Sequence, residues 1–145
     1  MEQELVVNKT AKINADISKV WNAFTDPEKT KEFMFGARVE SDWKVGSPII
    51  WKGMKDGKDI VFVQGSILNI EPGMVLQYTA FGPSGKLEDI PSNYTRVTMK
   101  FAPADGSTLL TVTQDNFGGD ETRYSESNSG WDYTIKGLKG LMEKQ

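Results

Sequence analysis

Turn-forming residues divide the middle of this chain into short segments, and their spacing constrains the fold more than any other feature of the sequence. Clusters containing Gly, Pro, Asp or Ser occur at residues 45–48, 55–58, 71–73, 82–85 and 104–106, and these residue types favour tight turns. Between them lie apolar runs at residues 37–40, 49–52, 60–70, 75–81, 94–101 and 108–114. Short connections join neighbouring antiparallel strands, so the pattern predicts an antiparallel meander of about six strands.

The residues before the meander predict one strand and two short helices. Residues 5–13 alternate between apolar and polar side chains, which is typical of a half-buried strand. Asp16 is suited to cap a helix whose apolar residues recur every three or four positions and therefore share one side. Asp26 and Pro27 indicate the start of a second helix, which is expected to end near Met34. The apolar side of the first helix consists of Ile17, Val20, Trp21 and Phe24.

A helical pattern follows Gly118 and Gly119 and continues to the end of the chain. Its apolar residues form one stripe over about five turns, and they are Tyr124, Trp131, Ile135, Leu138 and Met142, with Leu141 beside them. Three glycines, Gly130, Gly137 and Gly140, interrupt this helix, and each costs roughly 1 kcal/mol in a helix interior. A close approach of the helix to the sheet is the expected compensation. The sequence therefore predicts an α+β fold that ends in one long helix.

Composition limits both the size of the fold and its chemistry. A chain of 145 residues fits a single domain, taken as residues 1–145, that buries about two-thirds of its surface on folding. The sequence contains no cysteine and no histidine. Disulfides, thiolate zinc sites and the usual general base near neutral pH are thereby excluded. No set of residues suggests a metal site or a cofactor, and no residue is assigned a catalytic role.

Charge and hydropathy exclude two further classes of partner. Seventeen basic and twenty acidic side chains give a net charge of -3, and the lysines are scattered, whereas a nucleic-acid-binding protein needs a concentrated basic face. No segment approaches the roughly 18 consecutive apolar residues of a membrane span. The acidic start of the chain does not resemble a secretory signal. We therefore expect a cytoplasmic protein that does not bind nucleic acid.

Three short motifs follow one another near the start of the chain: Ile13-Asn14-Ala15, Val20-Trp21 and Phe24-Thr25-Asp26-Pro27. Together they resemble the opening of the SRPBCC (START-like) superfamily, which has the helix-grip fold of the birch-pollen allergen. Within the superfamily, the chain is similar to homologues of the activator of the 90-kDa heat-shock protein ATPase. The further matches are Asp42-Trp43, Val45-Gly46, Gly65, Ile70-Glu71-Pro72-Gly73, Leu76, Tyr78, Thr111 to Thr113, Gly130-Trp131, Leu138 and Leu141.

The resemblance implies a curved antiparallel sheet of about six to seven strands around the long C-terminal helix, with two short helices after the first strand. It also implies an internal apolar cavity, which members of the superfamily use for lipids, sterols, polyketides and other hydrophobic molecules.

The candidate binding residues are those that alternation places on the concave face of such a sheet, together with apolar residues of the helices. Each of them could instead simply fill the core. Gln114 and Tyr78 are the polar members, and a ligand, an ordered water or a backbone group would have to satisfy them when buried. The set consists of Leu76, Tyr78, Val97, Met99, Phe101, Leu110, Val112 and Gln114, with Trp51 and Phe62 less securely placed, and Phe33, Phe35, Trp131, Ile135 and Leu138 from the helices.

Three functions remain open at this point. The favoured hypothesis is the binding of a hydrophobic or amphipathic small molecule in the cavity. The first alternative is an enzyme of the cyclase, aromatase or hydrolase type that uses a carboxylate or a tyrosine in the cavity. The least favoured alternative is an interaction module with a chaperone partner, for which Phe33-Met34-Phe35 is the candidate surface.

Overall fold

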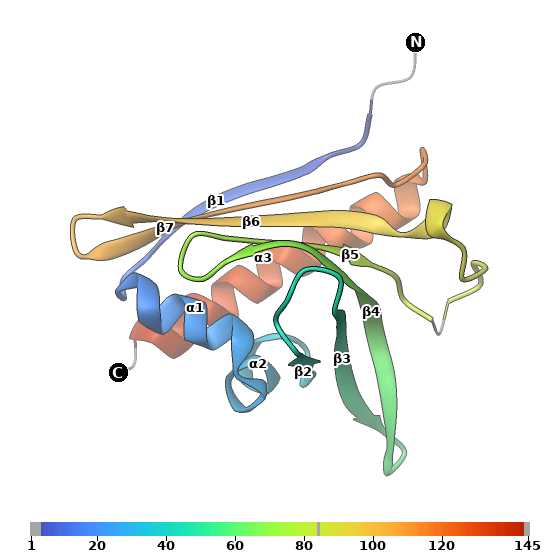
Figure 1. The fold of residues 1–145 in the computed structure, drawn as a ribbon, viewed down its shortest axis with the longest axis horizontal. Helices are drawn as coiled ribbons and strands as arrows, with labels where there is room; N and C mark the ends of the chain where they lie inside the picture. The colour runs from blue at the N-terminus through green and yellow to red at the C-terminus, as the bar shows by residue number, and fades with distance from the viewer. Residues whose placement is uncertain (1–3, 84, 144–145) are drawn as a thin grey trace.

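A seven-stranded antiparallel sheet lies across one long C-terminal helix in the computed structural model, which describes residues 4–83 and 85–143 (Figure 1). The strands follow the order β1-β7-β6-β5-β4-β3-β2 across the sheet. The α+β helix-grip architecture predicted from the sequence is therefore confirmed. The elements are β1 (Val7–Ile13), α1 (Ile17–Thr25), α2 (Pro27–Phe33), β2 (Arg38–Ser41), β3 (Pro48–Lys55), β4 (Lys58–Glu71), β5 (Val75–Ala80), a 3-10 turn (Pro91–Asn93), β6 (Thr95–Ala104), β7 (Ser107–Asp115) and α3 (Glu121–Glu143).

The register of the central strands brings their apolar side chains onto one face. Leu76 of β5 pairs with Met99 of β6, and Met99 pairs with Val112 of β7. All three side chains are buried. Since directly paired residues point to the same side of a sheet, these strands present a continuous apolar surface to α3.

Gly65 allows the sheet to bend in the middle of β4. The first half of β4 pairs with β3, and its second half pairs with β5. A Cβ atom at Gly65 would lie 1.6 Å from the backbone oxygen of Thr79, so no other residue fits without a shift of the backbone. The hairpin of β3 and β4 consequently points away from β5, β6 and β7 (Figure 1).

The two short helices begin where capping residues satisfy their free backbone N–H groups. Asp16 accepts a hydrogen bond from the backbone nitrogen of Lys19, and Asp26 accepts one from that of Glu28. At the other end of α2, the buried hydroxyl of Thr30 donates to the carbonyl oxygen of Ala37 and accepts from the backbone N–H of Val39. These bonds fix the end of α2 against β2.

Helix α3 buries a narrower stripe than the sequence predicts. Its buried residues are Trp131, Thr134, Leu138 and Met142. Ile135 is only half-buried, because Thr134 takes the inward position one turn after Trp131.

We predicted that the glycines of α3 let the helix approach the sheet, but the structure shows a close approach to α2, at Gly137. A Cβ atom at Gly137 would lie 3.1 Å from the Cβ of Phe33, a Cβ at Gly130 would lie 3.9 Å from the Phe35 ring, and a Cβ at Gly140 would have no neighbour within 4 Å among the described residues. None of the helices in the described part of the chain is long and apolar enough to cross a membrane.

Candidate functional site

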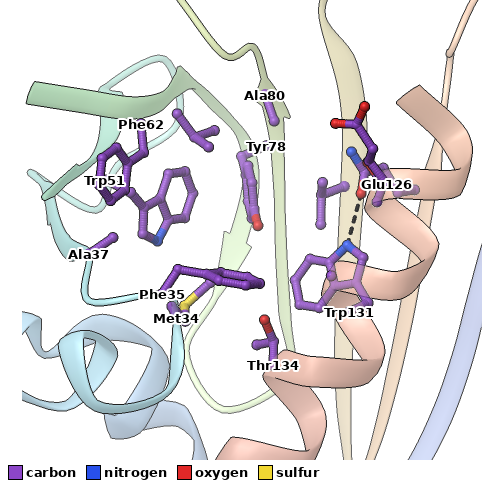
Figure 2. Close-up of a pocket in the computed structure, with 15 residues that line it drawn as sticks. Met34, Phe35, Ala37, Trp51, Phe62, Tyr78, Ala80, Glu126, Trp131 and Thr134 are labelled. Atoms are coloured by element: carbon purple, nitrogen blue, oxygen red, sulfur yellow. Dashed lines mark hydrogen bonds between the residues drawn. The ribbon is translucent and has the colours of Figure 1, made fainter. Parts of the chain in front are cut away.

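A pocket of about 310 Å³ lies between the sheet and the first half of α3. Its walls come from the turn that follows α2, from β3, β4, β5, β6 and β7, and from residues 126–134 of α3. The lining is mainly apolar and aromatic, as Figure 2 shows. Toward its C-terminal end, α3 packs on α2 and α1. The space is therefore confined to the part of the helix that lies away from these contacts.

The structure brings together about half of the residues predicted for the site. Seven of them line the pocket: Phe35, Trp51, Phe62, Tyr78, Val97, Gln114 and Trp131. Whether they bind a ligand stays a prediction. Seven others pack in the core outside the pocket: Phe33, Leu76, Met99, Phe101, Leu110, Val112 and Leu138. Ile135 belongs to neither group.

The division of the predicted residues between the pocket and the core has a simple geometric cause. Alternation tells which face of a strand points inward, but it does not tell where along the strand the helix moves away from the sheet. On β5, Leu76 is in the core, whereas Tyr78 and Ala80, on the same face, reach the pocket.

Eight further residues, most of them small or polar, complete the lining, and the sequence analysis did not predict them. They are Met34, Ala37, Val63, Ala80, Glu126, Ser127, Gly130 and Thr134. Ala80 lies two residues after Tyr78, on the same face of β5, and Thr134 lies three positions after Trp131, on the same side of α3. Their positions in the sequence therefore indicated that both side chains point inward. A choice restricted to large apolar side chains excluded both of them.

Gln114 takes part in a buried hydrogen-bond network between the sheet and α3. Its side-chain oxygen accepts from the indole nitrogen of Trp131 at 2.8 Å, and its amide nitrogen donates to the hydroxyl of Thr95 at 3.0 Å. The Thr95 hydroxyl in turn donates to the carbonyl oxygen of Ala80. The network orients Trp131 against the pocket, so Gln114 contributes to the shape of the site.

Trp51 and Tyr78 form an aromatic pair opposite α3. Their ring centroids lie 4.9 Å apart at an angle of 44°, and both side chains are buried. In Figure 2 the Tyr78 hydroxyl points into the pocket, toward Phe35 and Thr134. Burial raises the pKa of Tyr78 well above its usual value of 10.0, and no other cause contributes to the shift. The hydroxyl is therefore neutral near neutral pH and available as a hydrogen-bond donor.

An exposed aromatic pair borders the pocket between α2 and α3. The rings of Phe35 and Tyr133 stack with centroids 4.7 Å apart and an interplanar angle of 20°. Their side chains are 59% and 60% exposed. Phe35 has a φ of 57° and is followed by Gly36 with a φ of 77°, a left-handed turn that directs the chain from α2 into β2.

Glu126 stands where the pocket adjoins a wider surface hollow of about 830 Å³. The two spaces share Val63, Ala80, Gln114, Glu126 and Ser127. The hollow extends between Gly82, residues 85–87 and the first turns of α3. Glu126 is exposed and is the one charged side chain among the described residues that line the pocket.

The fold and the pocket agree with the protein family that the chain matches. A family model described as activator of Hsp90 ATPase homolog 1-like protein matches residues 14–143. The chain belongs to this family. The resemblance predicted from the sequence motifs is thereby confirmed at the level of the family and of its helix-grip fold.

Several solved structures are similar to this AHSA1-like chain over nearly its whole length. ChR145 from Cytophaga hutchinsonii is 39% identical, with 99% of this chain and 97% of that chain covered and a TM-score of 0.81. Two others, at 18% identity, show the fold alone. The Aha1 dimer from Colwellia psychrerythraea has a TM-score of 0.74, with 95% and 96% of the two chains covered. DynU16, from the dynemicin biosynthetic locus, has a TM-score of 0.75, with 97% and 48% covered. The comparison with curated proteins gave no match.

Proposed function

We propose that this AHSA1-like protein binds a hydrophobic small molecule in the pocket between the sheet and α3. The observation that carries the proposal is the pocket itself, a space of about 310 Å³ among aromatic and apolar side chains. Small-molecule sites commonly measure about 300–1,000 Å³, with mainly apolar walls and a few polar groups that orient the ligand. Tyr78, Gln114 and Thr134 supply such polar groups here.

The size of the pocket limits both the ligand and its affinity. Burial of roughly 300 Å² of ligand surface contributes about 7 kcal/mol at 25 cal/mol per Å². The loss of translational and rotational freedom on association opposes this gain. A ligand of one or two rings that binds with micromolar affinity or more weakly fits these limits.

A variant that fills the pocket tests the proposal. Ala80 is buried and lines the pocket from β5, so Ala80→Phe places a ring in the space that the ligand needs. Ala102 of β6 is exposed, and Ala102→Phe is the matched control. Native mass spectrometry, with 2-acetylnaphthalene and a panel of lipids added, should detect a complex for the wild type and Ala102→Phe and none for Ala80→Phe. Absence of any complex with the wild type would contradict the proposal.

Tyr78 supports a second candidate function, in which the pocket is an active site. A tyrosine with a raised pKa in the cavity is what the enzyme hypothesis requires. The direction of the shift makes Tyr78 a weak acid and disfavours it as a base near neutral pH. Recovery of a bound compound with unchanged mass after long incubation favours binding alone. A product of altered mass that is absent with Tyr78→Phe favours catalysis.

The exposed pair of Phe35 and Tyr133 is what the chaperone-partner hypothesis would use. Phe33, which the sequence placed in the same candidate surface, is only 2% exposed and belongs to the core. The apolar surface left for a partner is therefore smaller than the sequence suggested. Binding of a purified 90-kDa chaperone that is lost in Tyr133→Ala would favour this function over the first.

A further inference from the structure

One buried donor in the pocket wall has no acceptor. The indole nitrogen of Trp51 is buried and has no hydrogen-bond partner among residues 4–83 and 85–143, although the side chain as a whole lines the pocket and is 6% exposed. Buried polar groups are nearly always paired, and an unpaired donor is costly. The other indole in the wall, that of Trp131, does have an acceptor, Gln114. The unpaired nitrogen of Trp51 is therefore a local feature of this end of the pocket.

A second donor lies beside it. The Trp51 and Tyr78 rings are in contact, and in Figure 2 the indole nitrogen and the phenol oxygen both lie on the side of their rings that faces Phe35. An indole N–H can only donate, and a neutral phenol can donate as well. Two donors on rings that touch each other suit one oxygen with two lone pairs, such as the oxygen of a carbonyl group.

Charge in the pocket disfavours an anion at this position. Among the described residues that line the pocket, none is lysine or arginine, and the charged one is the acidic Glu126. Transfer of a carboxylate into such a space without a counter-ion is costly. A neutral acceptor avoids this cost.

The side chain beside the indole nitrogen is largely exposed. Figure 2 shows the nitrogen on the side of Trp51 that faces Met34 and Phe35. Phe35 is 59% exposed, so displacement of its ring exposes little buried apolar surface. A ligand that displaces this ring reaches the buried donor.

From these observations we infer that the bound molecule has an uncharged buried end that presents a carbonyl-type oxygen to the indole N–H of Trp51 and the hydroxyl of Tyr78. The inference rests on the proposed function and specifies its ligand. Aromatic ketones and neutral esters belong to the class that fits, whereas pure hydrocarbons and free fatty acids do not.

Three probes of similar shape separate these classes. 2-Acetylnaphthalene carries the acceptor, 2-isopropenylnaphthalene replaces the carbonyl oxygen by a CH₂ group, and 2-naphthoate carries a negative charge. Isothermal titration of the wild-type protein should show the ketone binding at least about tenfold more tightly than the alkene, since each of the two buried hydrogen bonds contributes about that factor. The carboxylate should bind more weakly than the ketone.

Substitutions of the two donors provide the matched controls. Trp51→Phe and Tyr78→Phe each keep an aromatic ring and remove one donor, so the preference for the ketone over the alkene should fall while the affinity for the alkene changes little. In spectra of ¹⁵N-labelled protein, which contains four tryptophans, the indole signal that disappears in Trp51→Phe should move downfield with the ketone and stay in place with the alkene. The shift is measured on the wild-type protein, and Trp51→Phe serves only to assign the signal.

The outcomes distinguish the inference from the function on which it rests. Equal affinity for the ketone and the alkene, or an unchanged Trp51 indole signal with bound ketone, overturns the inference and leaves the proposed function standing. Tighter binding of the carboxylate than of the ketone overturns the claim that the buried end of the ligand is uncharged. Failure of all three probes to bind contradicts the proposed function and the inference together.

Discussion

The indole nitrogen of Trp131 donates a hydrogen bond of 2.8 Å to the side-chain oxygen of Gln114, and this bond joins α3 to β7 at the edge of the pocket. Both side chains are at least nine-tenths buried. The bond therefore holds the helix at the distance from the sheet that leaves the pocket open.

Replacement of Gln114 by leucine should destabilise the protein by about 1–3 kcal/mol, because the buried Trp131 nitrogen loses its acceptor and the Thr95 hydroxyl loses a donor. Urea unfolding measures the change. Gln77→Leu is the control, since the Gln77 side chain makes a similar bond to Thr98 at a less buried site, and it should cost less. Equal losses in the two variants would contradict the role assigned to the network.

Two glycines of α3 should respond differently to alanine. A Cβ at Gly140 would meet none of the described residues within 4 Å, so Gly140→Ala should raise the unfolding free energy by about 0.5–1 kcal/mol. Gly137→Ala brings its new methyl group to 3.1 Å from Phe33, and this crowding should offset most of the same gain. Thermal unfolding measures the change in stability of the two variants. A larger gain at Gly137 than at Gly140 would show that α2 and α3 are not in tight contact.

Alanine substitutions of the two phenylalanines at and just after the end of α2 should differ strongly in their effect on stability. Phe33 is 2% exposed and packs edge-on against Phe24, so Phe33→Ala should cost about 3–5 kcal/mol. Phe35 is largely exposed, and Phe35→Ala should cost about 1 kcal/mol or less. Because Phe35 covers one side of the pocket, its loss should also speed the association of 2-acetylnaphthalene in stopped-flow measurements. An unchanged association rate would remove Phe35 from the entry route.

The buried hydroxyl of Tyr78 should make stability depend on pH in the alkaline range. Its pKa is raised in the folded protein above the usual 10.0. The stability that goes with the neutral hydroxyl is therefore complete below pH 10 and is lost as the pH rises further, since the unfolded chain releases the proton first. The unfolding free energy of the wild type should fall more steeply above pH 10 than that of Tyr78→Phe, by up to about 1.4 kcal/mol per pH unit. If the unfolding free energies of the wild type and Tyr78→Phe fall in parallel above pH 10, the Tyr78 hydroxyl is exposed to water and not buried.

Much of the fold was predictable from the sequence because its signals are local. Alternation identified the inward face of β5, β6 and β7, and capping by Asp16 and Asp26 marked the starts of two helices. These features depend only on neighbouring residues and on backbone geometry.

The position of the pocket was less predictable because it depends on where α3 leaves the sheet. That position is set by distant contacts, such as Gly137 against Phe33 and Trp131 with Gln114. The unpaired nitrogen of Trp51 likewise has no signal in the sequence, since it becomes visible only when all neighbours of the ring are known.

The most direct test of the account is the location of a bound apolar molecule by intermolecular nuclear Overhauser effects. With 2-acetylnaphthalene added, the account predicts contacts from the naphthalene protons to the methyl groups of Val97 and Ala80 and to the ring of Trp131, which line the pocket, and none to the exposed Ala102. Contacts only to exposed side chains such as Leu109 or Met54 would contradict it.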